Sequence, residues 1–190
     1  MKKDVILLGI QGCGKGTQAE LLLKTLKKHK YLEMGNTLRA LTSNDNLIGN
    51  YLKDRMTKGF LVDHEMTFGI LDMCLHITKK SSGYLVIDGF PRCKEQMYFF
   101  LSRMMQENRD FVVVHYALTK KVALERIMKR AKLQGRKDDK PESIKKRLEI
   151  FQEETMPVIN YLKSIGKVIE IDANDTVENI FKNTKKKLGL

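Results

Sequence analysis

Four short runs of mostly apolar residues recur along this chain, and several of them end at a glycine or an aspartate. Uninterrupted runs rich in Val, Ile and Leu are typical of strands that are buried on both faces of a parallel sheet. We therefore predict strands at residues 4–8, 84–88, 111–118 and 168–172.

Longer segments, in which apolar residues recur at the spacing of one helix face, separate these runs. They predict helices at roughly residues 18–29, 64–79, 94–107, 120–133, 141–163 and 176–188. The alternation of strands with helices predicts an α/β fold, arranged in three layers (α/β/α) around a central parallel sheet.

Two segments depart from this alternation. Residues 31–61 contain polar and small residues, with helical patches at 37–41 and 47–57, and no strand is predicted there. They fall between the first two core strands, so we expect a small helical insertion. Residues 131–140 are polar and are predicted to form a loop between two helices.

The composition is that of a globular chain. Hydrophobic residues make up 42% of the 190 residues and charged residues 31%, which disfavours disorder. No apolar run approaches the ~20 residues that a membrane-spanning helix needs. The apolar stretch at residues 5–10 is too short for a secretory signal. We expect a cytoplasmic protein with no membrane partner.

The charge is strongly positive, with a formal net charge of +12 and a pI near 9.6. Two interpretations compete: a solvated lysine-rich surface, or attraction to polyanions such as nucleotides or nucleic acid. We favour the first for most lysines. The chain has no basic stripe interleaved with aromatic residues of the kind that stacks bases, so no specific nucleic-acid partner is expected.

The three cysteines, Cys13, Cys74 and Cys93, fit neither a zinc knuckle nor a CxxC redox pair. In a reducing compartment we expect free thiols. Cys13 lies in a glycine-rich segment, where helix N-terminal amides could lower its pKa. The simpler interpretation is that it fills a slot for a small residue.

The glycine-rich segment at residues 9–17, Gly-Ile-Gln-Gly-Cys-Gly-Lys-Gly-Thr, carries the strongest chemical signal. It follows a predicted strand, opens a predicted helix and matches the G-x-x-x-x-G-K pattern of phosphate-binding loops. Glycines let successive backbone N–H groups turn toward phosphate oxygens, and the helix adds its positive end. The lysine supplies a mobile charge, and Thr17 supplies a hydroxyl for Mg²⁺ or phosphate. The predicted ATP-binding residues here are Gly12, Cys13, Gly14, Lys15, Gly16 and Thr17.

Asp88 ends the second predicted strand, at the sheet edge where α/β proteins bind ligands. A carboxylate there suits Mg²⁺, directly or through water. The alternative is an aspartate that caps a helix or a turn. Arg92 follows four residues later, on a turn that Pro91 makes rigid.

Further arginines follow this turn along the chain. Arg126 and Arg130 share one face of a predicted helix, Arg136 lies in the polar loop, and Arg147 comes from the next helix. Phosphoryl transfer needs positioning and charge neutralisation more than covalent chemistry, and arginine binds phosphate through two parallel hydrogen bonds. Several arginines around one phosphate loop favour transfer between two phosphate-bearing substrates over hydrolysis. For each arginine alone, the alternative is a surface salt bridge, with Asp138 and Asp139 as available partners for Arg136.

These motifs together resemble the adenylate kinase family of nucleoside monophosphate kinases. The resemblance covers almost the whole chain and rests on residues 12–18, 38–39, 59–62, 87–92 with Gln96, 135–139 and 144–148. It implies one kinase domain, residues 1–190, with its core at 1–29, 61–129 and 141–190. It also implies a helical monophosphate-binding lobe at 30–60 and a short lid at 130–140, without a structural zinc. The expected partners are ATP, AMP and ADP with Mg²⁺, and a monomer is expected.

The resemblance also assigns roles by matching position. The phosphates would be cradled by the predicted catalytic set Lys15, Arg92, Arg130, Arg136 and Arg147. Arg126 would lie against the ATP adenine, and Arg130 would also contact ATP. The acceptor nucleotide would contact Met34, Arg39, Phe60, Leu61, Val62, Gly89, Phe90, Pro91, Arg92, Gln96, Arg136 and Arg147.

The resemblance leaves two alternatives open for the acceptor base. The amide of Gln96 can pair with adenine, whereas relatives that act on UMP and CMP typically carry Asn at that place, so AMP is favoured. Met34 replaces a threonine of the family pattern, and Asp63 and His64 replace a proline and an aspartate. A UMP/CMP or broad-specificity kinase is therefore the alternative, and a non-catalytic P-loop or nucleic-acid-binding module is less favoured.

Overall fold

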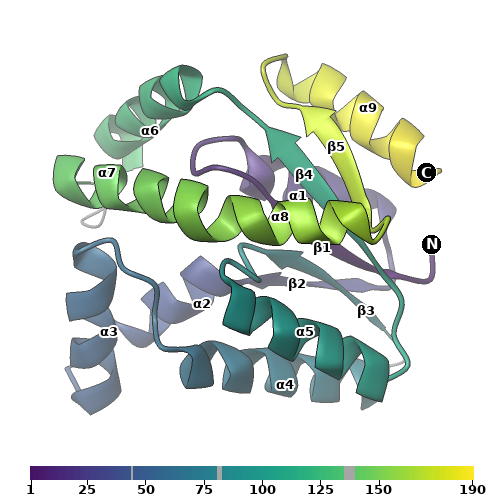
Figure 1. The fold of residues 1–190 in the computed structure, drawn as a ribbon, viewed down its shortest axis with the longest axis horizontal. Helices are drawn as coiled ribbons and strands as arrows, with labels where there is room; N and C mark the ends of the chain where they lie inside the picture. The colour runs from purple at the N-terminus through teal and green to yellow at the C-terminus, as the bar shows by residue number, and fades with distance from the viewer. Residues whose placement is uncertain (44, 81–82, 135–139) are drawn as a thin grey trace.

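The computed structural model describes residues 1–43, 45–80, 83–134 and 140–190, and it has a parallel sheet with helices on both faces (Figure 1). Within these residues the sheet has five strands in the order β2-β3-β1-β4-β5, and each neighbouring pair is parallel. The predicted fold class is confirmed. The strands are β1 (Asp4–Leu8), β2 (His29–Glu33), β3 (Tyr84–Asp88), β4 (Phe111–Ala117) and β5 (Val168–Asp172).

The helices follow the sequence prediction closely. The predicted helix at 141–163 is one continuous helical segment, in which a single π-helical turn, η1, joins α7 to α8. The first helix starts at the lysine of the glycine-rich loop rather than at residue 18. The helices are α1 (Lys15–Thr25), α2 (Met34–Leu41), α3 (Leu47–Thr57), α4 (His64–Lys80), α5 (Lys94–Gln106), α6 (Lys120–Gln134), α7 (Pro141–Ile150), η1 (Phe151–Thr155), α8 (Met156–Ser164) and α9 (Val177–Leu188).

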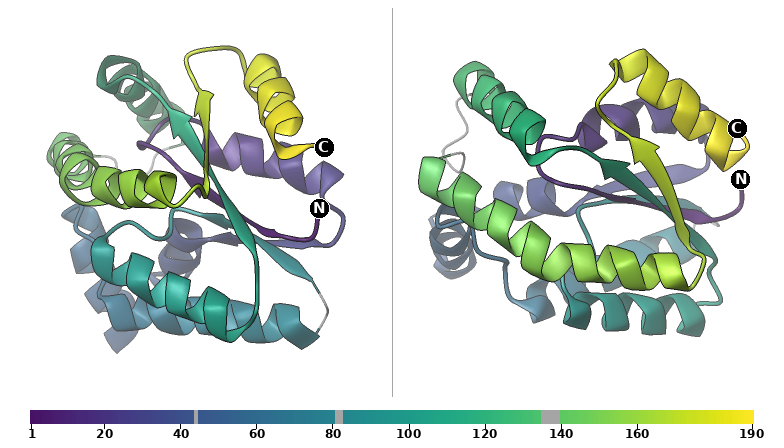
Figure 2. Two further views of the ribbon diagram at one scale, coloured as in Figure 1. Left: turned by 45° about the vertical axis from the view of Figure 1, so that its right-hand side comes forward. Right: turned by 45° about the horizontal axis from the view of Figure 1, so that its top comes forward.

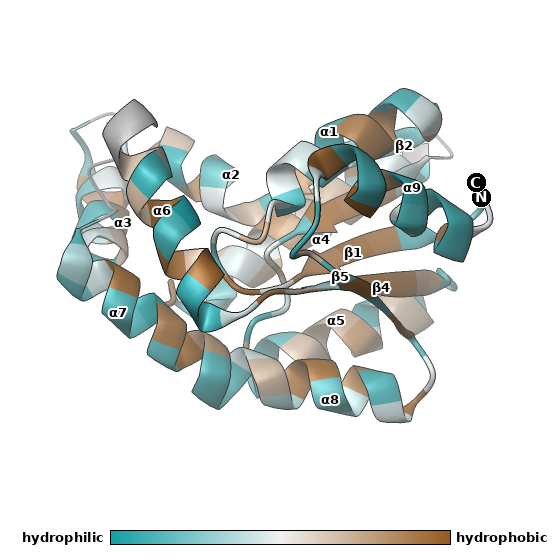
Figure 3. Cartoon of the chain, turned by 90° about the horizontal axis from the view of Figure 1, so that it is seen from above, coloured by the Kyte–Doolittle hydropathy of each residue, from teal (hydrophilic) through white to brown (hydrophobic). Residues whose placement is uncertain are grey.

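Two hydrophobic cores lie on opposite faces of the sheet. Alternate residues of β1 point to opposite faces: Ile6 and Leu8 pack with α4, α5 and α8, whereas Val5 and Leu7 pack with α1, α6 and α9. Figure 2 shows these helical layers on either side of the strands, and Figure 3 shows β1 and β4 as predominantly hydrophobic between them. Burial on both faces explains the uninterrupted apolar runs in the sequence.

The prediction that residues 31–61 contain no strand is wrong, because β2 extends into this segment and pairs with β3 at the edge of the sheet. His29 and Leu32 are buried, but Lys30 and Tyr31 are exposed. An edge strand faces solvent on part of its surface and therefore need not be an apolar run. The helical insertion consists of α2 and α3, which follow β2.

Within the described ranges, no helix combines the length and apolarity that crossing a membrane requires. The cysteines Cys13, Cys74 and Cys93 are free, as predicted.

Candidate nucleotide-binding site

A cavity of about 440 Å³ opens at the carboxyl edge of the sheet, above β1 and β3. This edge is where open α/β sheets bind ligands. The cavity is lined by the β1–α1 loop, the start of α2, the segment before α4, the turn after β3, and the α7–η1 helix. Among the predicted site residues, it is lined by Gly12, Gly14, Lys15, Gly16, Thr17, Met34, Arg39, Phe60, Leu61, Val62, Asp88, Gly89, Phe90, Arg92, Gln96, Arg126 and Arg147.

The floor of the cavity is the glycine-rich loop, whose curl depends on residues without a side chain. Gly12 has a φ of 85°, and a Cβ there would lie 2.9 Å from the carbonyl oxygen of Ala123. Gly14, at φ 93°, precedes the first residue of α1. The free N–H groups of the first helical turn therefore face the cavity at the point where the loop ends.

Lys15 crosses this loop from the start of α1. Its ammonium donates to the carbonyl oxygens of Gly9 at 2.8 Å and Ile10 at 3.3 Å, and lies 3.5 Å from the Cys13 sulfur. The charge is thus held beside the loop amides, on a side chain that also lines the cavity.

Cys13 does not line the cavity. Its side chain is buried, 1% exposed, and a Cβ on Gly9 would lie 2.7 Å from its sulfur. Burial raises the pKa of the Cys13 thiol, although Lys15 opposes the shift. The side chain packs beneath the loop, as the simpler interpretation of this residue expects, so any contact with phosphate would come from its backbone.

Asp88 lies at the end of β3, beside the loop. Its carboxylate is buried and accepts a hydrogen bond from the Tyr31 hydroxyl at 3.3 Å. Burial raises the pKa of Asp88, whereas the charges of Lys15 and Arg92 oppose the shift. Asp88 does not cap the helix that follows, because the N-cap of α5 is Cys93. A buried carboxylate that faces a cavity beside two cations is typical of a functional site.

Arg92 is held through both its backbone and its side chain. Its Nε donates to the Gly89 carbonyl at 2.7 Å, its own carbonyl accepts from the Thr155 hydroxyl at 2.8 Å, and its N–H donates to Gln96 Oε1 at 2.8 Å. Gly89 has a φ of 78°, and a Cβ there would lie 2.5 Å from Arg92 Nη2. Pro91, buried and joined to Phe90 by a cis peptide bond, supports this turn without lining the cavity.

Arginines from other elements line the same cavity. Arg39 on α2 donates to Glu33 Oε1 at 3.0 Å, and Arg147 on α7 donates to the Met56 carbonyl at 3.2 Å. Arg126 lies on α6. Cations from the insertion, the β3 turn, α6 and α7 therefore gather around one space. Three predicted participants fall outside the described residues, namely Arg136, Asp138 and Asp139, and the Arg130 side chain is likewise not described.

The residues predicted to lie near the acceptor base also line the cavity, and together they are called the Gln96 wall: Met34, Phe60, Leu61, Val62 and Gln96. Gln96 is 2% exposed, and its Nε2 lies 3.5 Å from the Thr67 hydroxyl. Its amide is therefore oriented from both ends, by Thr67 and by the Arg92 N–H. Met34 and Val62 are buried, whereas Phe60 is 44% exposed at the rim.

Several residues that line or organise the cavity carry no signal in the sequence alone. Glu33 orients Arg39, Thr67 contacts Gln96, and Thr155 fixes the Arg92 backbone. Thr155 lies in the π-helical turn, a feature that frequently occurs at functional sites. No local motif marks these positions, since each acts through a partner that is distant in the sequence or lies on another element.

The loop amides, the lysine and the arginines face one another across a single cavity, and this geometry suits phosphate groups rather than apolar ligands. The fold and the site therefore define a P-loop nucleotide-binding protein of the α/β class.

Comparison with known proteins narrows this class. Residues 7–167 match the adenylate kinase family. The chain is 35% identical over 189 residues to an adenylate kinase from Prochlorococcus marinus (strain MIT 9515), covering 100% of both chains. It is 33% identical over 186 residues to an adenylate kinase from Xanthomonas campestris pv. campestris (strain B100), covering 97% of this chain and 98% of the relative. A UMP-CMP kinase from Lentinula edodes is 32% identical over 192 residues, covering 95% and 83%.

The chain belongs to the adenylate kinase family of nucleoside monophosphate kinases. The resemblance drawn from the six sequence segments is thereby confirmed.

Proposed function

We propose that this chain transfers the γ-phosphate of ATP to AMP, reversibly, to give two molecules of ADP. The observation that carries the proposal is that one cavity is lined both by the phosphate loop and by the Gln96 wall. A donor and an acceptor nucleotide can therefore meet in one space, as transfer between two phosphate-bearing substrates requires.

On the donor side, the N–H groups of residues 12–17 and the Lys15 ammonium hold the phosphates of ATP, and Arg126 lies against its adenine. On the acceptor side, Arg39 and Arg92 hold the α-phosphate of AMP. Arg92 and Arg147, with Arg130 and Arg136, neutralise the charge that spreads over the transferred group. The reaction breaks the bond between the β- and γ-phosphates of ATP and forms a bond from the γ-phosphorus to an oxygen of the AMP phosphate.

Oxygen donors suited to Mg²⁺ line the same cavity. Asp88 offers a buried carboxylate and Thr17 a hydroxyl, and hard divalent cations prefer oxygen ligands. Asp88, through water, and Thr17 would hold the ion. A bound Mg²⁺ supplies positive charge to the phosphate oxygens. The raised pKa of Asp88 fits such a role, since a nearby cation would stabilise its ionised form.

Residues 30–60 act in this proposal as the monophosphate-binding lobe and residues 130–140 as a short lid over a core formed by the rest of the chain. Contacts between the insertion and α7 support coupled positioning of the lobe. Arg147 bonds to Met56, and a Cβ on Gly59 would lie 2.7 Å from the Ser143 carbonyl. Exclusion of water by these segments would direct the γ-phosphate to AMP rather than to hydrolysis.

A pyrimidine or broad-specificity acceptor is the second candidate. Met34 places a buried thioether on the Gln96 wall, where the threonine of the family pattern would offer a hydroxyl for hydrogen bonding to the base. The similarity to the UMP-CMP kinase of Lentinula edodes is almost as high as that to the adenylate kinases. AMP remains the favoured acceptor because the oriented Gln96 amide offers both a donor and an acceptor to adenine.

The test is a coupled assay of ADP formation with ATP and Mg²⁺ against AMP, CMP, UMP and GMP. The proposal predicts the highest kcat/KM with AMP, and a kcat that is about a thousandfold lower with every acceptor in the Lys15→Ala variant. A higher kcat/KM with UMP or CMP would replace AMP by the second candidate. Absence of transfer to all four acceptors by the wild type would contradict the function itself.

We also propose that the protein acts as a monomer in the cytoplasm, with nucleotides rather than nucleic acids as its partners. Gel filtration with light scattering tests whether the protein is a monomer. A salt-dependent affinity for RNA that is tighter than the affinity for ATP would contradict the proposal that nucleotides rather than nucleic acids are the partners.

A further inference from the structure

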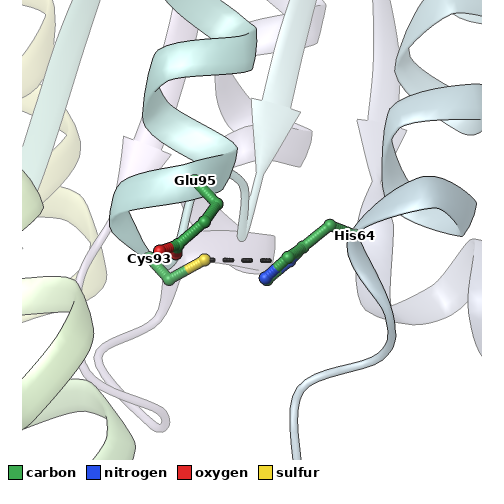
Figure 4. Close-up of side chains that lie close together, drawn as sticks. All are labelled: His64, Cys93 and Glu95. Atoms are coloured by element: carbon green, nitrogen blue, oxygen red, sulfur yellow. Dashed lines mark hydrogen bonds between the residues drawn. The ribbon is translucent and has the colours of Figure 1, made fainter.

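A second group of side chains with metal-binding chemistry lies outside the nucleotide contacts described above. His64 is the first residue of α4, Cys93 is the N-cap of α5, and Glu95 lies in the first turn of α5. One ligand atom from each residue lies within 4.8 Å of the other two, and the Cys93 sulfur is 3.9 Å from His64 Nδ1 (Figure 4). Two helix starts that are distant in the sequence thus bring an imidazole, a thiol and a carboxylate to one point.

The surrounding packing holds this geometry. The His64 ring stacks on Phe68 with centroids 5.9 Å apart, and Phe68 stacks on Phe99 of α5 at 3.9 Å. The aromatic contacts therefore fix the imidazole relative to α5. Cys93 is 2% exposed and Glu95 is exposed, so the group has a buried side and a side that is open to solvent. An ion could enter from the Glu95 side.

A nucleophilic cysteine is one alternative use of a thiol beside a histidine, but the environment opposes it. Burial and the nearby Glu95 carboxylate raise the pKa of Cys93 to about 11. The thiol makes its hydrogen bond with His64 Nδ1, and its raised pKa keeps it protonated rather than in the thiolate form that a nucleophile needs. A protonated, buried thiol is a poor nucleophile, whereas a metal ion can displace its proton.

We propose that His64, Cys93 and Glu95 form a binding site for one divalent metal ion of the zinc type, with the fourth position open to water. Nitrogen, sulfur and carboxylate donors are the ligands of zinc in proteins. Ligands at zinc distances in a tetrahedral site lie about 3.3–3.8 Å apart, so the three atoms need to move by only a fraction of an ångström to about one ångström. Binding forms three metal–ligand bonds and breaks the S–H bond of Cys93, whose proton goes to solvent.

This site differs from a zinc-bearing lid and from the proposed Mg²⁺ position. It contains one cysteine rather than four, and its donors come from α4 and α5 rather than from residues 130–140. Mg²⁺ favours an all-oxygen shell and binds thiols poorly. The site therefore selects a different ion from the one that accompanies ATP.

The location gives the ion a route to the nucleotide site. His64 directly follows the segment that contains Leu61 and Val62, and Cys93 directly follows Arg92, all of which line the main cavity. An ion that joins His64 to Cys93 would restrain two walls of that cavity. A bound ion would therefore change the affinity of the protein for the acceptor nucleotide, an inference that rests on the proposed function. By linkage, the bound acceptor nucleotide would change the affinity for the ion by the same factor.

The test is a titration of the nucleotide-free protein with Co²⁺ and Zn²⁺ under reducing conditions. Co²⁺ reports thiolate coordination through a charge-transfer band in the near ultraviolet. We expect one equivalent of Co²⁺ to bind with this band, and Zn²⁺ to displace it. Cys93→Ser and His64→Gln should each remove the band and weaken binding by at least tenfold, and Glu95→Gln should weaken binding by about tenfold.

Matched controls come from α4. Cys74→Ser, His76→Gln and Glu65→Gln alter a cysteine, a histidine and a glutamate of α4 outside the group, and each should bind like the wild type. Wild-type affinity in both Cys93→Ser and His64→Gln, or loss of the band in Cys74→Ser, would overturn the proposal. Because His64 is only half-buried, its variant provides the test even if Cys93→Ser fails to fold. Metal binding is measured without nucleotides, so its failure is distinguishable from a failure of the kinase function.

Discussion

The two ends of the central sheet each contain a buried aspartate, and the two carboxylates differ in their partners. At the amino end, Asp4 is 0% exposed, receives hydrogen bonds from Arg109 Nε at 2.7 Å and Nη2 at 2.6 Å, and accepts from the Leu85 N–H at 2.6 Å. At the carboxyl end, Asp88 accepts from Tyr31 at 3.3 Å and faces the cavity.

The comparison separates a structural carboxylate from a functional one. Asp4 has a guanidinium in bidentate contact, so its charge is satisfied within the chain. Asp88 is buried beside Lys15 and Arg92, yet burial still raises its pKa. Burial of the Asp88 carboxylate is therefore unfavourable in free energy, and a ligand cation bound at the carboxyl end of the sheet can offset this cost.

The largest expected effect concerns the carboxyl end. Lys15→Ala should lower kcat by about a thousandfold with every acceptor, because it removes a charge aimed at the transferring phosphate. The coupled assay gives the rate, and circular dichroism checks the fold. Lys24→Ala, which changes an exposed lysine in the last turn of the same helix, is the control and should retain wild-type activity. A loss below tenfold for Lys15→Ala would contradict the role assigned to this residue.

At the amino end, the expected effect is on stability. Asp4→Asn should lower the free energy of unfolding by about 3 kcal/mol, because it leaves the Arg109 guanidinium buried without its ionic partner. Urea titration measures the change. The folded variant should keep its KM for AMP. If stability changed by less than ~1 kcal/mol while activity fell, the distinction between the two sheet ends would be lost.

A substitution in the β3 turn probes the positioning of Arg92. Gly89→Ala should lower kcat/KM by about a hundredfold, because the added Cβ meets Arg92 Nη2 at 2.5 Å and the residue has a φ of 78°. Gly69→Ala is the matched control: it lies within α4, and its Cβ would meet no atom within 4 Å. The control should leave activity unchanged and leave stability equal or raised by about 0.5–1 kcal/mol. Equal activity of the two variants would refute this account of Arg92.

The smallest expected effect is an increase in stability. The folded-state pKa of Asp88 lies above its ordinary value of 3.8, so the folded protein retains a proton that the unfolded chain releases. Stability therefore falls as the pH rises from the ordinary pKa through the raised folded-state pKa. Asp88→Asn should raise the free energy of unfolding at pH 7 by about 1 kcal/mol, and this gain should shrink as the pH approaches 3.8.

Asp172 serves as a comparison for the same experiment, because its pKa is shifted in the opposite direction. It ends β5, is exposed, and hydrogen bonds from the backbone and side chain of Asn174 lower its pKa. Its contribution is present above the ordinary pKa and is lost as the pH falls. Asp172→Asn should therefore not stabilise the protein at pH 7. A stabilisation of both variants would show that burial of the Asp88 carboxylate is not the cause.

Much of the fold could be predicted because its causes are local. Strands buried on both faces appear as apolar runs, as in residues 84–88 and 111–117, and helices appear through their periodicity. The edge strand β2 could not be predicted this way, since Lys30 and Tyr31 are exposed and its pairing depends on β3. The helix α1 starts at Lys15, before the predicted residue 18, because glycines and a lysine obscure the helical pattern there.

The site likewise contains residues that a local motif predicts and residues that only the folded chain brings together. The phosphate loop is one short segment whose backbone forms the binding surface, so the sequence alone indicates it. Thr155 and Glu33 act on arginines of other elements, and only the folded chain brings them together. The pair of His64 and Cys93 is separated by 29 residues and exists only because α4 and α5 pack side by side.

The central claim is that the oriented Gln96 amide selects AMP while the loop and the arginines perform the transfer. The most direct measurement compares kcat/KM for AMP and UMP in the wild type and in Gln96→Asn. We predict that the wild type prefers AMP and that the variant lowers the AMP-to-UMP ratio by at least tenfold while remaining active with UMP. An unchanged ratio, or an equal loss of activity with both acceptors, would contradict the claim.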